Sequence, residues 1–231
     1  MNESTNFLDT FLEKSKYILA QISVIILYVF LVISLRSMFI QGITSTNKSI
    51  ETAAYILIEL IILIIYIAIF RKTLVPDWDD FKKNFRKYIK DNYKYWVYGL
   101  LVMIISNTII NEFLDIPINE ELNRNMIDKL PIYSLISITI CAPLIEEAMT
   151  RIFFRKAINN KYVYMITSGL IFGSLHLLSI TSLIEVLYVI PYSALGCAFA
   201  YIYYNSNNIY TNIFFHALHN TIAIILIFGG M

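Results

Sequence analysis

The chain has 231 residues with a formal net charge of +1, and 58% of them are hydrophobic. Only 15% are charged, whereas a soluble domain of this length carries about 25% charged residues. The apolar residues also form long uninterrupted runs, which excludes an ordinary soluble domain and predicts an all-α, polytopic transmembrane helix bundle. We expect the lipid bilayer as the environment of the chain and no nucleic acid as a partner.

Seven segments are candidates for membrane spans, because a helix needs about 20 mostly apolar residues to cross the hydrocarbon core. We therefore expect about seven spans in one compact membrane domain. In chain order they are Tyr17–Leu35, Ala53–Phe70, Tyr95–Ile110, Pro131–Phe154, Tyr162–Leu178, Leu183–Tyr204 and Ile209–Phe228.

The basic residues predict how these spans are oriented. Segment 71–94 holds eight Lys or Arg residues, segment 151–161 holds four, and Lys14 and Lys16 precede the first span. Seven spans place these fourteen on one side of the membrane and leave four on the other: Arg36, Lys48, Arg124 and Lys129. By the positive-inside rule, the N-terminus of this multi-pass cell-membrane protein is cytoplasmic, and the acidic loop 111–130 is outside.

A basic amphipathic helix is predicted within the cytoplasmic segment 71–94. Aromatic and aliphatic residues recur there at helical spacing, with basic residues between them: Trp78, Phe81, Phe85, Tyr88 and Ile89. This pattern suits a helix lying on an anionic inner leaflet, and an ordinary cytoplasmic loop is the alternative.

Ionisable residues inside the spans are the main functional signal, since each costs about 2.5–3.5 kcal/mol at the membrane centre on insertion scales. Glu146 and Glu147 are adjacent and therefore point about 100° apart on a helix. Glu147 can pair with Arg151 at the i+4 position. Glu146 then has no local cation, and a partly desolvated carboxylate is suited to act as a general base or acid.

The three histidines of the chain all lie in apolar segments near its C-terminal end. His176 follows Gly173 and Ser174, two small residues that would allow close helix approach. His216 and Asn220 are one helical turn apart, so both can donate hydrogen bonds to a single oxyanion. His219 lies near the same face, where we favour a packing or supporting role over direct participation.

The set of Glu146, the histidines and Asn220 contains the parts of a hydrolase: a base, a partner for water and an oxyanion hole. Two further acidic residues in apolar segments, Glu59 and Glu185, are expected to be structural.

The motifs, in this order on successive hydrophobic helices, resemble the CPBP family of intramembrane proteases. They are Glu-Glu-x-x-x-Arg at 146–151, Phe-x-x-x-His at 172–176 and His-x-x-x-Asn at 216–220. The family includes the eukaryotic CAAX prenyl endopeptidase and bacterial relatives linked to bacteriocin immunity or pheromone maturation. On this basis we divide the chain into N-terminal spans and loops (1–130) and a helical core with the site (131–231).

The resemblance implies a role for each motif residue. Glu146 would activate a water molecule together with His176, and His216 and Asn220 would bind the oxyanion. Glu147 and Arg151 would hold the geometry of the site. The family commonly has an aromatic residue before the motif arginine and a glycine after it, where this chain has Thr150 and Ile152.

Metal dependence is a separate question, because Glu146, His176 and His216 could together supply three ligands. The chain has no His-Glu-x-x-His motif. We therefore favour a metal-independent, glutamate-type reaction without a cofactor.

These patterns predict an intramembrane endopeptidase that cleaves a membrane-embedded peptide or protein tail. Because Glu146 lies near the cytoplasmic end of its predicted span, we expect its cavity to open towards the cytoplasm. One alternative is a non-catalytic membrane partner, such as a bacteriocin-immunity or sensor-modulating protein, in which the polar residues form a structural network. A proton-coupled transporter is less favoured because the sequence shows no inverted repeat.

Overall fold

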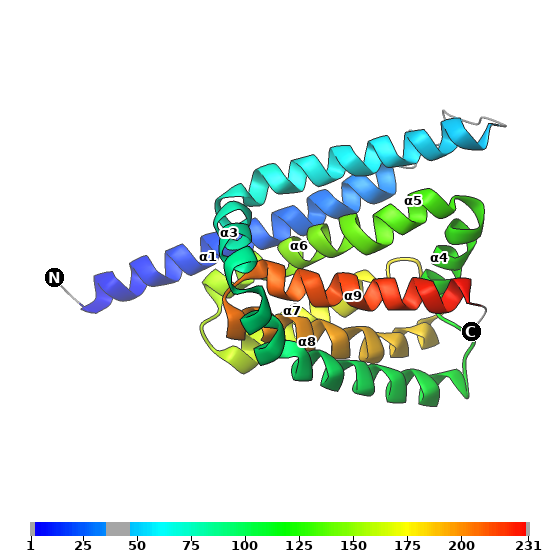
Figure 1. Cartoon of the computed structure of the whole chain (residues 1–231). Coiled ribbons are helices and arrows are strands. Elements are labelled where there is room, and N and C mark those ends of the chain that lie inside the picture. Colours follow the sequence, from blue (N-terminus) through cyan, green and yellow to red (C-terminus); the bar gives the residue numbers. More distant parts are fainter. Residues whose placement is uncertain (1–2, 36–46, 230–231) are drawn as a thin grey trace.

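The computed structural model describes residues 3–35 and 47–229, and every regular element in these ranges is a helix, as predicted. The helices pack side by side into an elongated bundle (Figure 1). Arg36, predicted on the outer side, lies outside the described residues. The elements are α1 (Glu3–Val29), η1 (Phe30–Leu35), α3 (Lys48–Asn111), α4 (Ile118–Lys129), α5 (Pro131–Ile136), η2 (Ser137–Cys141), α6 (Ala142–Ala157), α7 (Lys161–Leu175), η3 (Leu183–Tyr188), α8 (Val189–Ser206) and α9 (Ile209–Phe228).

The long helix α3 contains two of the predicted spans. Its first arm, around Ala53–Phe70, lies beside α1, and its second arm, around Tyr95–Ile110, returns along the opposite side of the bundle (Figure 1). Pro76 lies between the two arms, and proline bends a helix because it lacks an N–H and its ring clashes with the preceding turn.

Five helices among the described residues are long and apolar enough to cross a membrane: Asp9–Val32, Lys48–Asn111, Pro131–Ala157, Leu183–Ser206 and Ile209–Phe228. The two arms of α3 account for one more of the seven predicted spans. The remaining one, α7, has 15 residues, or about 22 Å at 1.5 Å per residue, so it is shorter than a full span.

The predicted amphipathic helix is present as the section of α3 that joins the two arms. Its basic residues are exposed, whereas Phe81 is buried and packs against the rings of Tyr210 and Phe214 on α9. Asp77 accepts a hydrogen bond from the backbone N–H of Ile209 at 2.8 Å. This section of α3 is therefore attached to the beginning of α9, across one end of the bundle (Figure 1).

Small residues bring α7 and α8 into close contact. A Cβ atom on Gly173 would lie 2.8 Å from the backbone nitrogen of Ser193, and one on Gly196 would lie 2.8 Å from the carbonyl oxygen of Gly169. The close approach predicted at Gly173 is confirmed, but Ser174 is exposed and does not take part. This packing fixes the end of α7, where His176 follows.

Helix α6 lies at the centre of the bundle and contacts α1, α7 and α9. Gln21 of α1 is fully buried, and its side-chain oxygen accepts hydrogen bonds from the backbone N–H groups of Phe153 and Phe154 at 3.1 and 3.0 Å. The apolar side chains around it, including Met149 and Ile152, belong to the largest buried cluster of the described residues. Both glutamates of the first motif thus lie on a firmly held helix.

Candidate active site

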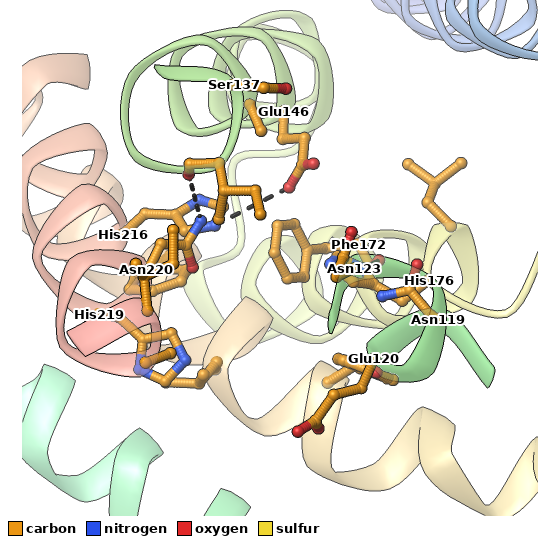
Figure 2. Close-up of a pocket in the computed structure, with 18 of the residues that line it drawn as sticks. Asn119, Glu120, Asn123, Ser137, Glu146, Phe172, His176, His216, His219 and Asn220 are labelled. Atoms are coloured by element: carbon orange, nitrogen blue, oxygen red, sulfur yellow. Dashed lines mark hydrogen bonds and ion pairs between the residues drawn. The ribbon is translucent and has the colours of Figure 1, made fainter. Parts of the chain in front are cut away.

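A cavity of about 550 Å³ lies between the helices, and it is lined by Glu146, His176, His216 and Asn220. Figure 2 shows these side chains projecting into it from α6, from the residue that follows α7, and from α9. His219 also lines the cavity, whereas Glu147 and Arg151 do not. The structure therefore brings the four predicted catalytic residues to one cavity, and it places the two predicted supporting residues behind the cavity wall.

A fully buried ion pair between Glu147 and Arg151 lies behind the wall of the cavity. Arg151 donates from Nε to Glu147 at 2.8 Å, and neither side chain is exposed to solvent. Arg151 also donates from Nη1 to the carbonyl oxygen and the hydroxyl of Ser168 on α7. The side-chain nitrogen of Asn212 on α9 donates a hydrogen bond to the carboxylate of Glu147. The carboxylate and the guanidinium thus connect α6, α7 and α9.

Glu147 also orients His216. Nδ1 of His216 lies 2.9 Å from Oε1 of Glu147, and an ionised carboxylate only accepts hydrogen bonds. Nδ1 must therefore carry a hydrogen, and the opposite nitrogen, Nε2, faces Glu146 at 3.8 Å (Figure 2). Glu146 keeps about 17% of its side chain exposed, so the two adjacent glutamates contact opposite edges of one imidazole ring.

His176 lies just beyond the end of α7, not within a span as the sequence predicted. Its backbone N–H bonds to the carbonyl oxygen of Gly173, which closes the last turn of the helix. Its Nδ1 lies 2.9 Å from the carbonyl oxygen of Phe172, and its ring stacks on Tyr192. Because a carbonyl oxygen only accepts, Nδ1 of His176 carries a hydrogen, and Nε2 has a free lone pair when the ring is neutral.

The ring of Phe172 lies between the two histidine rings. Its centroid is 4.7 Å from that of His176 and 5.5 Å from that of His216. Among the described residues, no hydrogen bond or ion pair joins Glu146 and His176. The structure thus pairs Glu146 with His216, and it places His176 across Phe172 in the same cavity (Figure 2).

Asn220 is held by an irregular turn just before the first motif. Its side-chain nitrogen donates to the carbonyl oxygen of Ile138 at 2.8 Å. Ile138 belongs to η2, a π-helical segment, and such turns occur frequently at functional sites. This hydrogen bond leaves the second N–H of the Asn220 amide for another acceptor.

Three residues of the site had no predicted role, although Phe172 belongs to the second motif. Asn212 and Ser168 bind the buried ion pair, and the ring of Phe172 lies 5.1 Å below the guanidinium of Arg151. Asn212 had a usable signal, since it lies one helical turn before His216. Ser168 had none, because a single serine in an apolar helix usually bonds to its own backbone.

The other two acidic residues of the apolar segments have local partners. Glu59 accepts a hydrogen bond from the hydroxyl of Tyr133 at 3.2 Å and also lines the cavity. Glu185 accepts from the backbone N–H of Ser182 at 3.0 Å and so caps η3. Within residues 3–35 and 47–229, no group of three His, Cys, Asp or Glu side chains is arranged to hold a metal ion.

The direction of the cavity differs from the prediction. Its lining includes Asn107 near the end of α3 and Asn119, Glu120 and Asn123 of α4, all at the end of the bundle away from the basic segments (Figure 1). The expectation of an opening at the basic end was wrong. It relied on the position of Glu146 alone, and α6 continues for eleven residues beyond Glu146 to Ala157, or about 16 Å.

These features define a helical membrane protein with a buried carboxylate–imidazole site beside a cavity. A family model described as type II CAAX prenyl endopeptidase Rce1-like matches residues 128–222, which include all three motifs. The predicted resemblance is thus confirmed over residues 128–222, which are similar to the Rce1-like family. No curated protein and no solved structure matches the chain.

Proposed function

We propose that the protein is an intramembrane endopeptidase that hydrolyses a peptide bond in a membrane-associated polypeptide. The observation that carries this proposal is the position of Glu146, 3.8 Å from Nε2 of His216 at the wall of a cavity in the Rce1-like region. A carboxylate beside an imidazole in a partly water-excluded cavity supplies both a base and a donor for hydrolysis.

The proposed reaction begins with a water molecule beside Glu146. The carboxylate of Glu146 takes a proton from the water, and the oxygen attacks the carbonyl carbon of the scissile bond. The free Nε2 of His176 accepts the second O–H of this water and orients it. As the C–N bond breaks, Glu146 returns its proton to the leaving amine, so no proton is gained or lost overall.

The developing oxyanion needs donors, and His216 and Asn220 can provide them. Nε2 of His216 donates only when the ring is protonated, because Nδ1 already directs its hydrogen to Glu147. The buried Glu147 carboxylate stabilises this imidazolium, as a buried carboxylate does in other catalytic histidine pairs. The free N–H of Asn220 is the second donor, while the Ile138 carbonyl keeps the amide oriented.

The decisive test compares cells that express the full chain with cells that express Glu146→Gln. New protein termini in the membrane fraction are quantified by mass spectrometry. We expect a set of termini that depends on Glu146 and persists in a matched control, Glu185→Gln, which changes a carboxylate of η3 outside the cavity. Identical termini with and without the Glu146 carboxylate would support the non-catalytic alternative, a membrane partner such as an immunity protein.

A further inference from the structure

The end of the bundle that carries the basic segments is closed. The middle of α3 lies across it, with Phe81 only 7% exposed, and Asn208 donates to the carbonyl oxygen of Asp77 at 2.7 Å. Asn205 donates to Asn92 at 2.9 Å in the same region. Within the described part of the chain, no residue of 71–94 and none of 151–171 lines the cavity.

The opposite end has a rim with two chemically different sides. On one side are the polar residues Asn119, Glu120 and Asn123 of α4, of which Asn123 is exposed. On the other side are Ile104 of α3 and Ile222 of α9, which are 47% and 40% exposed and also line the cavity. Both isoleucines lie on helices that are long and apolar enough to cross a membrane, where exposed apolar side chains are suited to contact lipid.

We infer that the substrate is the juxtamembrane segment of a membrane-anchored polypeptide, at the point where its apolar helix emerges into water on the side of α4. The apolar part enters between the second arm of α3 and the C-terminal half of α9, and the emerging polar part lies against α4. The positive-inside rule makes this the extracytoplasmic side. This inference rests on the proposed endopeptidase activity.

The lining of the rim fits such a segment. A peptide bond must leave its helix before it can be cleaved, and its freed N–H and C=O groups then need partners inside the membrane. The amide side chains of Asn107, Asn119 and Asn123 can each donate and accept, and all three line the cavity. A fully soluble peptide would not cover the exposed isoleucines of the rim. A substrate that stayed helical within the membrane would have no free backbone groups to bond with the asparagine amides.

The first experiment tests the side of access and does not depend on catalysis. In a Cys141→Ala/Cys197→Ala background, Asn123→Cys and Asn107→Cys are labelled with a membrane-impermeant thiol reagent in intact cells. Asn159→Cys, in the exposed connection between α6 and α7 at the basic end, is the matched control. We expect labelling of residues 123 and 107 in intact cells and of residue 159 only after permeabilisation. The reverse pattern would overturn the extracytoplasmic assignment even if the protein is a protease.

The second experiment tests the lateral route. Ile222→Trp places a larger side chain at the rim, whereas Ile225→Trp changes a residue of the same helix that is 62% exposed and does not line the cavity. We expect Ile222→Trp to reduce the abundance of the Glu146-dependent termini roughly tenfold or more, as blocking an access step would, and Ile225→Trp to leave them unchanged. Equal termini in the two variants, with equal amounts of protein, would exclude entry between α3 and α9.

Discussion

Glu147 and His216 are 69 positions apart in the sequence, yet Oε1 of the glutamate accepts a hydrogen bond from Nδ1 of the histidine at 2.9 Å. This contact determines which nitrogen of His216 faces the cavity. It also distinguishes the surroundings of the two adjacent glutamates. Glu147 is fully buried and accepts hydrogen bonds from Arg151, Asn212 and His216, whereas Glu146 remains partly open to the cavity.

Loss of the Glu147 carboxylate should strongly destabilise the fold. Glu147→Gln leaves Arg151 buried without a counter-charge, and breaking a buried pair in this way costs about 3–5 kcal/mol. The double variant Glu147→Gln/Arg151→Met removes both charges and should recover part of this loss. The measurement is reversible unfolding of the purified protein in detergent.

The exposed pair of Glu120 and Arg124 provides the control for this prediction. It has the same i, i+4 spacing, but both side chains are about 40% exposed. Glu120→Gln should therefore change the free energy of unfolding by less than about 1 kcal/mol. A double variant as unstable as Glu147→Gln alone would show that the buried charge is not the source of the effect.

Asn220 should affect the rate of cleavage more than substrate binding. Asn220→Ala removes one proposed oxyanion donor, and loss of such a donor lowers kcat by about 10²–10³-fold. KM should change little, since the donor acts on charge that develops only in the transition state. A membrane-anchored reporter built around a Glu146-dependent cleavage site provides the assay.

The neighbouring Thr221 supplies a matched control for Asn220. Its hydroxyl donates to the carbonyl oxygen of Ala217 within α9, and its side chain does not line the cavity. Thr221→Val should therefore cleave the reporter at the rate of the unmodified protein. A raised KM with normal kcat in Asn220→Ala would argue for a role in binding instead of oxyanion stabilisation.

The sequence was sufficient to name residues that line one cavity, but it did not predict their contacts. The pairing of Glu147 with Arg151 follows from i, i+4 spacing, and the order of the three motifs was sufficient to indicate the family. The contacts of His216 could not be predicted, because they depend on how α6 and α9 are rotated relative to each other. The π-helical turn η2 affects this rotation, and Ser-Ile-Thr-Ile-Cys carries no recognisable signal for it.

The end of the bundle towards which the cavity extends could also not be predicted from the sequence. Segment 71–94 has the pattern of a helix on a membrane surface, and its exposed basic residues agree with this. The pattern does not reveal that Phe81 and Asp77 of the same helix pack onto the beginning of α9 and close that end of the bundle. The periodicity of a segment predicts which residues share one face of a helix. Contacts with residues distant in the sequence determine which part of the protein that face packs against.

The attachment of α3 to α9 should contribute measurably to stability. Asp77→Ala removes the carboxylate that accepts from the backbone N–H of Ile209 in the first turn of α9. Loss of a comparable helix cap costs about 1 kcal/mol. Asp79→Ala is the control, because Asp79 is exposed and contacts only Lys82 among the ion pairs of the described residues. Equal unfolding free energies for the two variants would contradict a role for Asp77 in closing this end.

Gly173 should affect both stability and activity, because it sets the distance between α7 and α8 beside His176. The added methyl group of Gly173→Ala would lie 2.8 Å from the backbone nitrogen of Ser193, so the helices must separate. Overpacking of this kind costs about 1–3 kcal/mol. The shift also moves His176, and we expect reporter cleavage to fall in protein that is still folded. Ser174→Ala, one residue further along and exposed, should change neither the unfolding free energy nor the cleavage rate. Normal activity in Gly173→Ala would show that the position of His176 does not depend on this helix contact.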